Sequence, residues 1–199
     1  MGSLVSPSDA RLMRVSENLG EAIDGQRHCP ENVFKENWGT FSVFHADWIF
    51  EGAFVEKVLS LLREEGSSIA CLVYLAADAA SSRPAFAFDR ESTAAAFESA
   101  LRGAGPQDGL SYAIQRFACI SDRGLWCIYC ERQNELALFG RRRESSRDAF
   151  EAFLCSVSAR RIADVASGAE DFGFSEVEIS DEWRAQLLRA YSDGDPTGR

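Results

Sequence analysis

Hydrophobic and polar positions alternate along residues 40–48, TFSVFHADW, and this alternation predicts a β-strand. Over 52–65 the apolar residues recur three or four positions apart, which predicts a helix that ends at Gly66. The unbroken apolar run at 69–76 is typical of a central strand that is buried on both faces. A β-α-β unit is therefore expected to open the main domain.

The rest of the chain reads as further strands with helices grouped between them. A turn at 122–124, Asp-Arg-Gly, separates two strand-like runs and predicts a hairpin. This grouping predicts an α+β fold with a mostly antiparallel sheet and helices packed on it. Strands are expected at 84–88, 111–121, 125–132, 135–140 and 172–179, and helices at 91–102, 146–165 and 181–191.

The first 39 residues carry weaker patterns. Ser8 or Asp9 is suited to cap a short helix that Gly20 would end, and 38–40 reads as a loop. The pattern divides the chain into an N-terminal extension at 1–39, one α+β domain at 40–191 and a disordered tail at 192–199.

Charge narrows the functional classes. The chain has 199 residues, a formal net charge of −10 and a sequence pI of about 4.8. This acidic balance argues against nucleic-acid binding, which depends on Lys and Arg, and favours a basic protein partner. Neither a signal peptide nor an apolar run of about 20 residues is present, so a cytoplasmic protein without a membrane anchor is expected. Arg greatly outnumbers Lys, a bias of GC-rich bacterial genes.

Trp126-Cys127-x-x-Cys130 has the spelling of thioredoxin-like redox motifs. In that chemistry the motif sits at a helix N-terminus, where the helix dipole lowers the pKa of the first thiol. Here the surroundings predict a strand, in which residues i and i+3 lie about 10 Å apart and point to opposite faces. A disulfide needs Cα atoms within about 7 Å. We therefore expect two structural thiols, one facing the core and the other the opposite side of the sheet.

The remaining cysteines also read as structural. Cys71 and Cys119 lie in apolar runs and Cys155 lies on an apolar helix face, and these positions predict buried thiols that pack as small hydrophobic side chains. A second CxxC, which would complete a zinc site, is lacking, as is a Gly-rich loop for a nucleotide. We therefore expect neither a metal nor a cofactor.

Both histidines are candidates for chemistry. In a strand, His45 and Asp47 would share a face and could serve as a general base with an orienting carboxylate. Packing of His45 beside Trp48 is the structural alternative. His28 and Cys29 are adjacent, and adjacent residues rarely reach the geometry of a nucleophile and its base.

Acidic residues gather at 164–182, a segment without Lys or Arg. Glu176 and Glu178 alternate with aliphatic residues, so a strand would present both carboxylates on one face. Together with Asp181 and Glu182 they form a candidate docking surface for a cationic protein, and solubility alone is the alternative.

Two polar clusters flank the strand at 135–140. Glu131 and Glu135 belong to the sequence ERQNE, which reads either as a turn or as a loop that contacts a partner. The basic run 141–143, with Arg147, reads as a solvated strand-to-helix connection, and a grip on a phosphate or an acidic partner is the alternative.

The stretch 126–138, with Trp126, Glu131, Arg132 and Glu135 at its fixed positions, resembles a pattern in small bacterial proteins of the toxin-immunity type. In those proteins a Trp-containing strand runs into an Arg-acid turn and then into an aliphatic strand. The resemblance implies an acidic cytoplasmic protein that binds and blocks a cognate toxin, and it assigns no role to single residues.

Our hypothesis is therefore a non-enzymatic immunity protein that occludes the active site of a toxin. A small enzyme with a shallow site near His45 and Asp47, or a subunit of a larger assembly, are the alternatives. The residues expected to contact the basic partner are Glu176, Glu178, Asp181, Glu182, Glu131 and Glu135.

Overall fold

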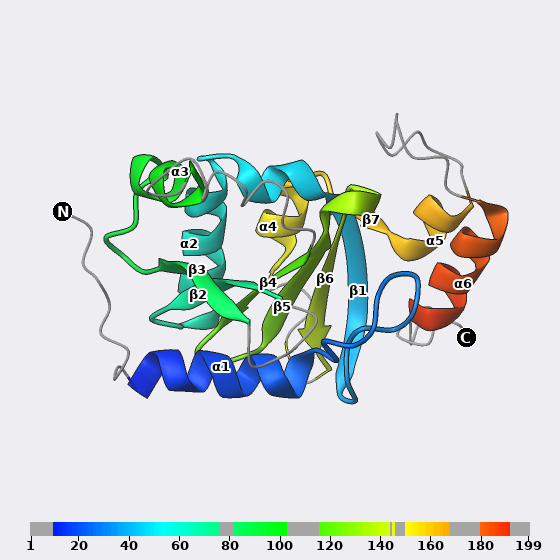
Figure 1. The fold of residues 1–199 in the computed structure, drawn as a ribbon, viewed down its shortest axis with the longest axis horizontal. Helices are drawn as coiled ribbons and strands as arrows, with labels where there is room; N and C mark the ends of the chain where they lie inside the picture. Colours follow the sequence, from blue (N-terminus) through cyan, green and yellow to red (C-terminus); the bar gives the residue numbers. More distant parts are fainter. Residues whose placement is uncertain are drawn as a thin grey trace.

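A seven-stranded sheet forms the middle layer of the molecule, with helices on both of its faces (Figure 1). The computed structural model describes residues 10–75, 82–102, 116–143, 145, 150–167 and 180–191. The strands follow the order β3-β2-β4-β5-β6-β1-β7, and every pairing is antiparallel, which confirms the α+β class. The strands are β1 (Trp38–His45), β2 (Ala70–Tyr74), β3 (Arg83–Phe88), β4 (Arg116–Ser121), β5 (Trp126–Glu131), β6 (Leu136–Arg142) and β7 (Arg160–Arg161).

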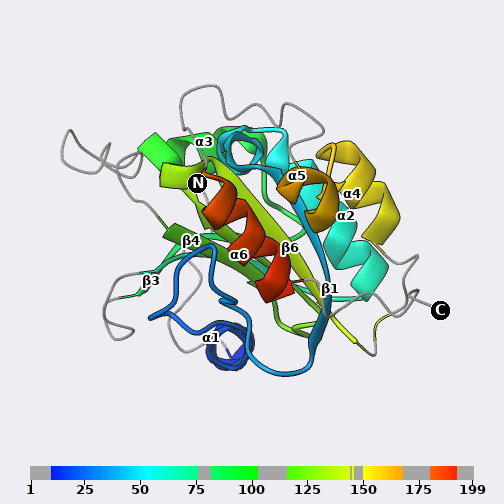
Figure 2. The ribbon, with the colours of Figure 1, turned by 90° about the vertical axis from the view of Figure 1, so that its right-hand side faces the viewer.

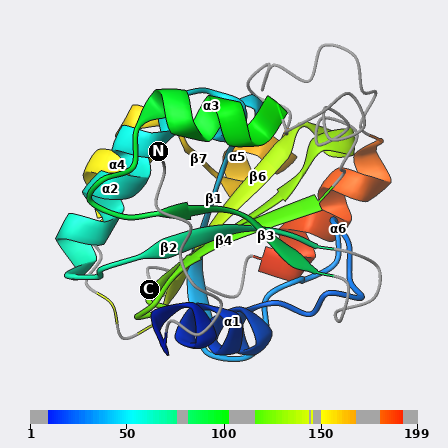
Figure 3. The same cartoon turned by 60° about the vertical axis from the view of Figure 1, so that its left-hand side comes forward.

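Two groups of helices cover the two faces of the sheet (Figure 3). One face carries the 3-10 helix η1 (Ala46–Phe50), α2 (Phe54–Glu65), α3 (Ala94–Arg102) and α4 (Glu151–Ser156). The other carries α1 (Ala10–Ala22), α5 (Ile162–Ala166) and α6 (Asp181–Tyr191). A single 3-10 turn, η4 (Arg132–Asn134), joins β5 to β6.

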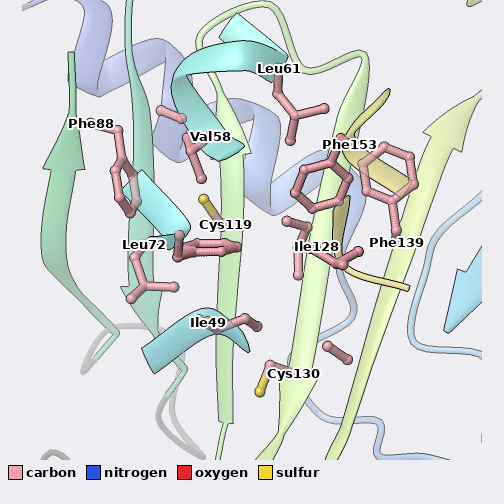
Figure 4. Packing of buried hydrophobic residues seen from close by; sticks show 14 of the residues in the cluster. Ile49, Val58, Leu61, Leu72, Phe88, Cys119, Ile128, Cys130, Phe139 and Phe153 are labelled. Carbon is pink, nitrogen blue, oxygen red and sulfur yellow. The ribbon is translucent and has the colours of Figure 1, made fainter. Parts of the chain in front are cut away.

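The central strands fill both cores alternately. Along β5, Trp126, Ile128 and Cys130 pack on the side of α2 and α4, whereas Cys127 and Tyr129 pack on the side of α1. Figure 4 shows Ile128 and Cys130 among the aromatic and aliphatic side chains of the first core. Burying a large apolar side chain contributes about 1.5–3 kcal/mol, so a strand covered on both faces has an unbroken apolar sequence.

Several elements follow the sequence pattern. α2 ends where Gly66 takes a left-handed φ of 72°, as expected of a helix-stopping glycine. The turn at 122–124 joins β4 to β5, and Gly124 there has a φ of 64°. β2, β3, β6, α3 and α6 also lie where the pattern predicts them.

The prediction of one long helix at 146–165 is wrong. Its described part divides into α4, the two-residue strand β7 and α5, and Ser158 between α4 and β7 has a φ of 52°. β7 pairs with Ser42 and Val43 at the edge of β1. Apolar periodicity shows which face of a segment is buried. It cannot show that two residues of the segment pair with a distant strand and so interrupt the helix.

The expected β-α-β unit is not confirmed. β1, α2 and β2 follow one another, but α1 precedes them and β4, β5 and β6 separate the two strands in the sheet. The loop expected at 38–40 is also wrong, because β1 begins at Trp38, and Gly39 marks a register shift against β6. Gly20 does not end α1, which runs to Ala22.

The segment before β1 packs on the sheet. Val15, Ala22, Val33 and Phe34 are all buried in the core that β4, β5 and β6 share. Residues 10–37 therefore complete this core. The strand expected at 172–179, the tail at 192–199 and the cap at Ser8 or Asp9 lie outside the described residues.

Candidate functional site

Cys127 and Cys130 are structural thiols. Both are fully buried, and they lie in opposite cores, as the strand pattern predicted. Burial raises the pKa of each thiol, because the charged thiolate loses its hydration. Neither side chain is therefore held as a reactive thiolate, and the WCxxC sequence does not form a redox centre in this fold.

Glu131 anchors a buried hydrogen-bond network. Glu131 is only 5 % exposed, and its carboxylate accepts hydrogen bonds from the Cys29 amide at 2.8 Å and the Tyr129 hydroxyl at 2.5 Å. The Asn134 side-chain amide donates a third bond, at 2.6 Å. The expectation that Glu131 contacts a partner does not fit this position, since its acceptor oxygens face inward and are occupied.

The same network holds the loop that contains His28 and Cys29. Arg116, itself buried, donates to the carbonyls of Gly25 and Arg27 and so ties this loop to β4. His28 is exposed and its Nδ1 lies 3.7 Å from Glu131 Oε1.

Cys29 is unsuited to act as a nucleophile. Burial raises the pKa of its thiol, and the neighbouring carboxylate of Glu131 raises it further. The expectation that Cys29 and His28 do not form a nucleophile pair agrees with this environment.

Glu65 forms a second buried network, which sequence reasoning missed. Its carboxylate accepts hydrogen bonds from the Trp126 indole at 2.9 Å, the Leu125 amide at 2.8 Å and the Ser67 hydroxyl at 2.6 Å. The Arg123 guanidinium donates to its backbone carbonyl. An acidic residue in the last turn of a helix opposes the helix dipole, and that conflict was the available signal in the sequence.

His45 is engaged on both ring nitrogens. Its Nδ1 accepts a hydrogen bond from the Asp47 amide at 3.2 Å, because His45 caps η1, and its Nε2 lies 3.5 Å from Glu135 Oε2. The Asp47 carboxylate lies 3.7 Å from Nδ1, but it belongs to η1 and not to a strand. This arrangement fixes a strand-to-helix corner, and the Asp47 amide uses the lone pair of Nδ1.

The basic run 141–143 is bound into the protein. Arg141 donates to the Thr40 hydroxyl and the Ser145 carbonyl, and Arg142 donates to the Gly124 carbonyl and to Glu21. These bonds join the end of β6 to its neighbours, which supports the structural reading of the cluster. Arg147 lies outside the described residues.

Three of the expected partner contacts are on the surface or near it. Asp181 and Glu182 are exposed in the first turn of α6, where the helix dipole favours acidic side chains. Glu135, at the end of η4, is partly exposed beside His45. Glu176 and Glu178 lie outside the described residues.

The negative charge is unevenly distributed along the chain. Within the described residues, acidic and basic side chains are almost equal in number. The acidic excess therefore belongs to the other segments, above all to 168–179, which has four carboxylates and no Lys or Arg. This segment directly precedes Asp181 and Glu182.

A cavity of about 740 Å³ opens beside the edge of β1, between α4 on one face of the sheet and α5 and α6 on the other. Figure 2 faces this end of the molecule. Aromatic and aliphatic side chains from β1, β6, α4, α5 and α6 line the cavity together with Arg141, Arg160 and Arg161. The sequence could not show that these segments meet. A smaller, mainly apolar cavity of about 270 Å³ lies between α1 and the strands β2 and β3.

Within the described ranges, His, Cys, Asp and Glu side chains form no group of three or more that could hold a metal ion. No helix in the part of the chain that the structure describes is long and apolar enough to cross a bilayer.

Comparison with protein-family models, curated proteins and solved structures found no match.

Proposed function

We propose that this chain is a non-enzymatic bacterial binding protein, of the immunity type, that neutralises a cognate toxin in the cytoplasm by occluding its active site. The observation that carries this proposal is the concentration of negative charge. The described body is nearly neutral, whereas 168–179 and the exposed start of α6, with Asp181 and Glu182, form one continuous acidic stretch of the chain.

The mechanism is electrostatic steering followed by occlusion. A toxin that acts on nucleic acid presents Arg and Lys at its substrate site, and an acidic stretch is complementary to that surface. Opposite charges speed the encounter, whereas buried aromatic and Arg anchors supply most of the final affinity. Glu176, Glu178, Asp181 and Glu182 are the proposed contacts, and Glu135 is a further candidate.

The state of the reactive side chains supports a binding role over an enzymatic one. Cys29, Cys127 and Cys130 are buried thiols of raised pKa, and His45 is bound on both nitrogens. A subunit of a larger assembly would be expected to expose a wide apolar patch. Among the described residues, the exposed large hydrophobic side chains are Met13 and Leu188.

The test is affinity capture from the source bacterium with the tagged full chain. The comparison variant replaces Glu176, Glu178, Asp181 and Glu182 with Lys; of these, Asp181 and Glu182 are exposed in the first turn of α6. One basic protein should be captured stoichiometrically by the wild-type chain, more slowly at high salt, and should be lost with this variant. A partner that both chains capture equally would overturn the proposed surface, and the absence of any partner would overturn the binding role.

A further inference from the structure

The smaller cavity, of about 270 Å³, is formed between α1 and the strands β2 and β3. Leu12, Val15 and Leu19 line it from the face of α1 that packs on the sheet. Cys71 and Val73 line it from β2, where alternate residues share one side of the sheet. Among the described residues of the lining, no side chain carries a charge. The space therefore favours apolar molecules, which gain free energy when they leave water.

Hydrogen bonds outside the cavity hold α1 in place over this space. The Asn18 side-chain amide donates to the Ser121 carbonyl at 3.1 Å, which ties α1 to the end of β4. At the end of the helix, the Lys35 amide donates to the Ala22 carbonyl at 2.9 Å. None of these four residues lines the cavity. The fold itself keeps the cavity open, so a ligand enters without the cost of separating α1 from the sheet.

Gly20 lines the cavity from inside α1. Glycine weakens the interior of a helix relative to alanine, and it is used where the backbone needs a left-handed φ or a close approach. Gly20 has neither need, because its φ is not left-handed and a Cβ added there would meet no described atom within 4 Å. Gly20 and Ser16, one helical turn apart, are both exposed at the mouth of the cavity. The missing side chain at position 20 therefore leaves this mouth open.

The volume of the cavity limits what it can hold. An apolar cavity of about 150 Å³ binds benzene, which is about 25 Å³ per carbon atom, so 270 Å³ holds about ten carbon atoms. An α-helix with its side chains is about 10–12 Å across and is too wide for such a space. A small molecule is therefore the ligand that fits, rather than a helix of a partner protein.

We propose that this cavity binds a small neutral molecule with an alkyl or aromatic body of up to about ten carbon atoms. Its affinity comes from the apolar area that is withdrawn from water. Carboxylates of neighbouring undescribed segments, such as Asp9 and Asp78, do not alter this contribution, because the ligand has no charge. The site is separate from the acidic start of α6 and does not depend on the proposed toxin surface.

The first test follows the methyl groups of Leu, Val and Ile by NMR while the full chain is titrated with primary alkanols from butanol to dodecanol. Each added methylene should tighten binding about fourfold, the equivalent of about 0.8 kcal/mol, and the gain should stop near ten carbon atoms, when the cavity is full. Adsorption to an apolar surface would instead gain with every methylene. Absence of saturable binding by any alkanol, or an affinity that still rises to dodecanol, overturns the proposal.

The same labelled chain shows where the ligand lies. Bound 1-octanol should give intermolecular NOEs to the methyl groups of Val15 and Val73, which line the cavity. Val58 and Ile128 lie in the core on the other face of the sheet and are the internal controls. NOEs that include the control pair, or NOEs to neither pair, place the ligand elsewhere and overturn the proposal.

Substitution of Gly20 tests the mouth of the cavity. A helical side chain leans back over the preceding turn, so Gly20→Leu should cover the mouth beside Ser16 and weaken octanol binding at least about tenfold. Gly20→Ala is the matched control, because it also replaces the helical glycine but adds one methyl group, and it should keep the affinity within about twofold. Urea denaturation should show both variants to be at least as stable as the wild type. Equal binding by all three chains, or equal weakening by both variants, overturns the proposal.

Discussion

The Glu131 network gives the sharpest prediction about stability. Glu131→Ala removes the acceptor for three donors, and two of these, the Cys29 amide and the Tyr129 hydroxyl, are buried. Each buried donor without a partner costs about 1–3 kcal/mol, whereas the partly exposed Asn134 can bind water instead. The expected loss is therefore about 4 kcal/mol of the free energy of unfolding, a large part of the roughly 5–15 kcal/mol of a typical domain.

Urea denaturation at pH 7 measures this loss. With a slope of about 2 kcal/mol per molar urea, the midpoint should fall by about 2 M. Glu182→Ala is the control, because this carboxylate is exposed in the first turn of α6 and should cost less than about 1 kcal/mol.

A double-mutant cycle isolates the bond between Glu131 and Tyr129. Combining Glu131→Ala with Tyr129→Phe removes the donor as well as the acceptor, so the two losses should not add, and a coupling of about 1.5–3 kcal/mol is expected for a hydrogen bond to a charged group. A loss below about 1 kcal/mol for Glu131→Ala would refute the reasoning, and Glu131 would return as a candidate for contact with a partner.

Three further predictions follow from the buried polar groups and thiols. Trp126→Phe keeps most of the ring packing but removes the indole donor to the buried Glu65 carboxylate, so urea denaturation should show a loss of about 2 kcal/mol, and a loss below about 0.5 kcal/mol would contradict this role. Iodoacetamide followed by mass spectrometry should label Cys155 rapidly and the other five cysteines only after urea is added, and fast labelling of Cys127 or Cys130 would contradict their burial. Burial raises the pKa of the Cys71 thiol from 9.0 to about 12, so the contribution of this thiol to stability is fully present below pH 9 and is lost as the pH rises toward 12. Between pH 8 and 11, the unfolding free energy of the wild type should therefore fall more steeply than that of Cys71→Ala, and equal falls would refute this.

Local patterns predicted much of the fold. The helix that Gly66 ends, the hairpin at 122–124 and the opposite orientation of Cys127 and Cys130 each depend on a few neighbouring residues, and each is present. The partition of 150–165 depended instead on a distant contact, because the edge of β1 pairs with Arg160 and Arg161. Periodicity within one segment carries no information about such a contact.

The candidate sites were harder to predict, because burial depends on the whole fold. The sequence around Glu131 is typical of a surface turn, yet the loop around Cys29 covers this residue and supplies one of its hydrogen-bond donors. Cys155 shows the opposite error: it was expected on a buried helix face but is exposed, whereas its neighbours Phe153 and Val157 are buried in the core. The cavity beside β1 joins residues from four segments that are far apart in the chain.

The most direct test of the proposed function is a titration of the captured partner's toxic activity with this protein. The wild-type chain should abolish that activity at one equivalent. The chain with Lys at Glu176, Glu178, Asp181 and Glu182 should need a large excess, mainly because its association is slower. Full toxic activity in the presence of excess wild-type chain would contradict the account, even if the two proteins bind.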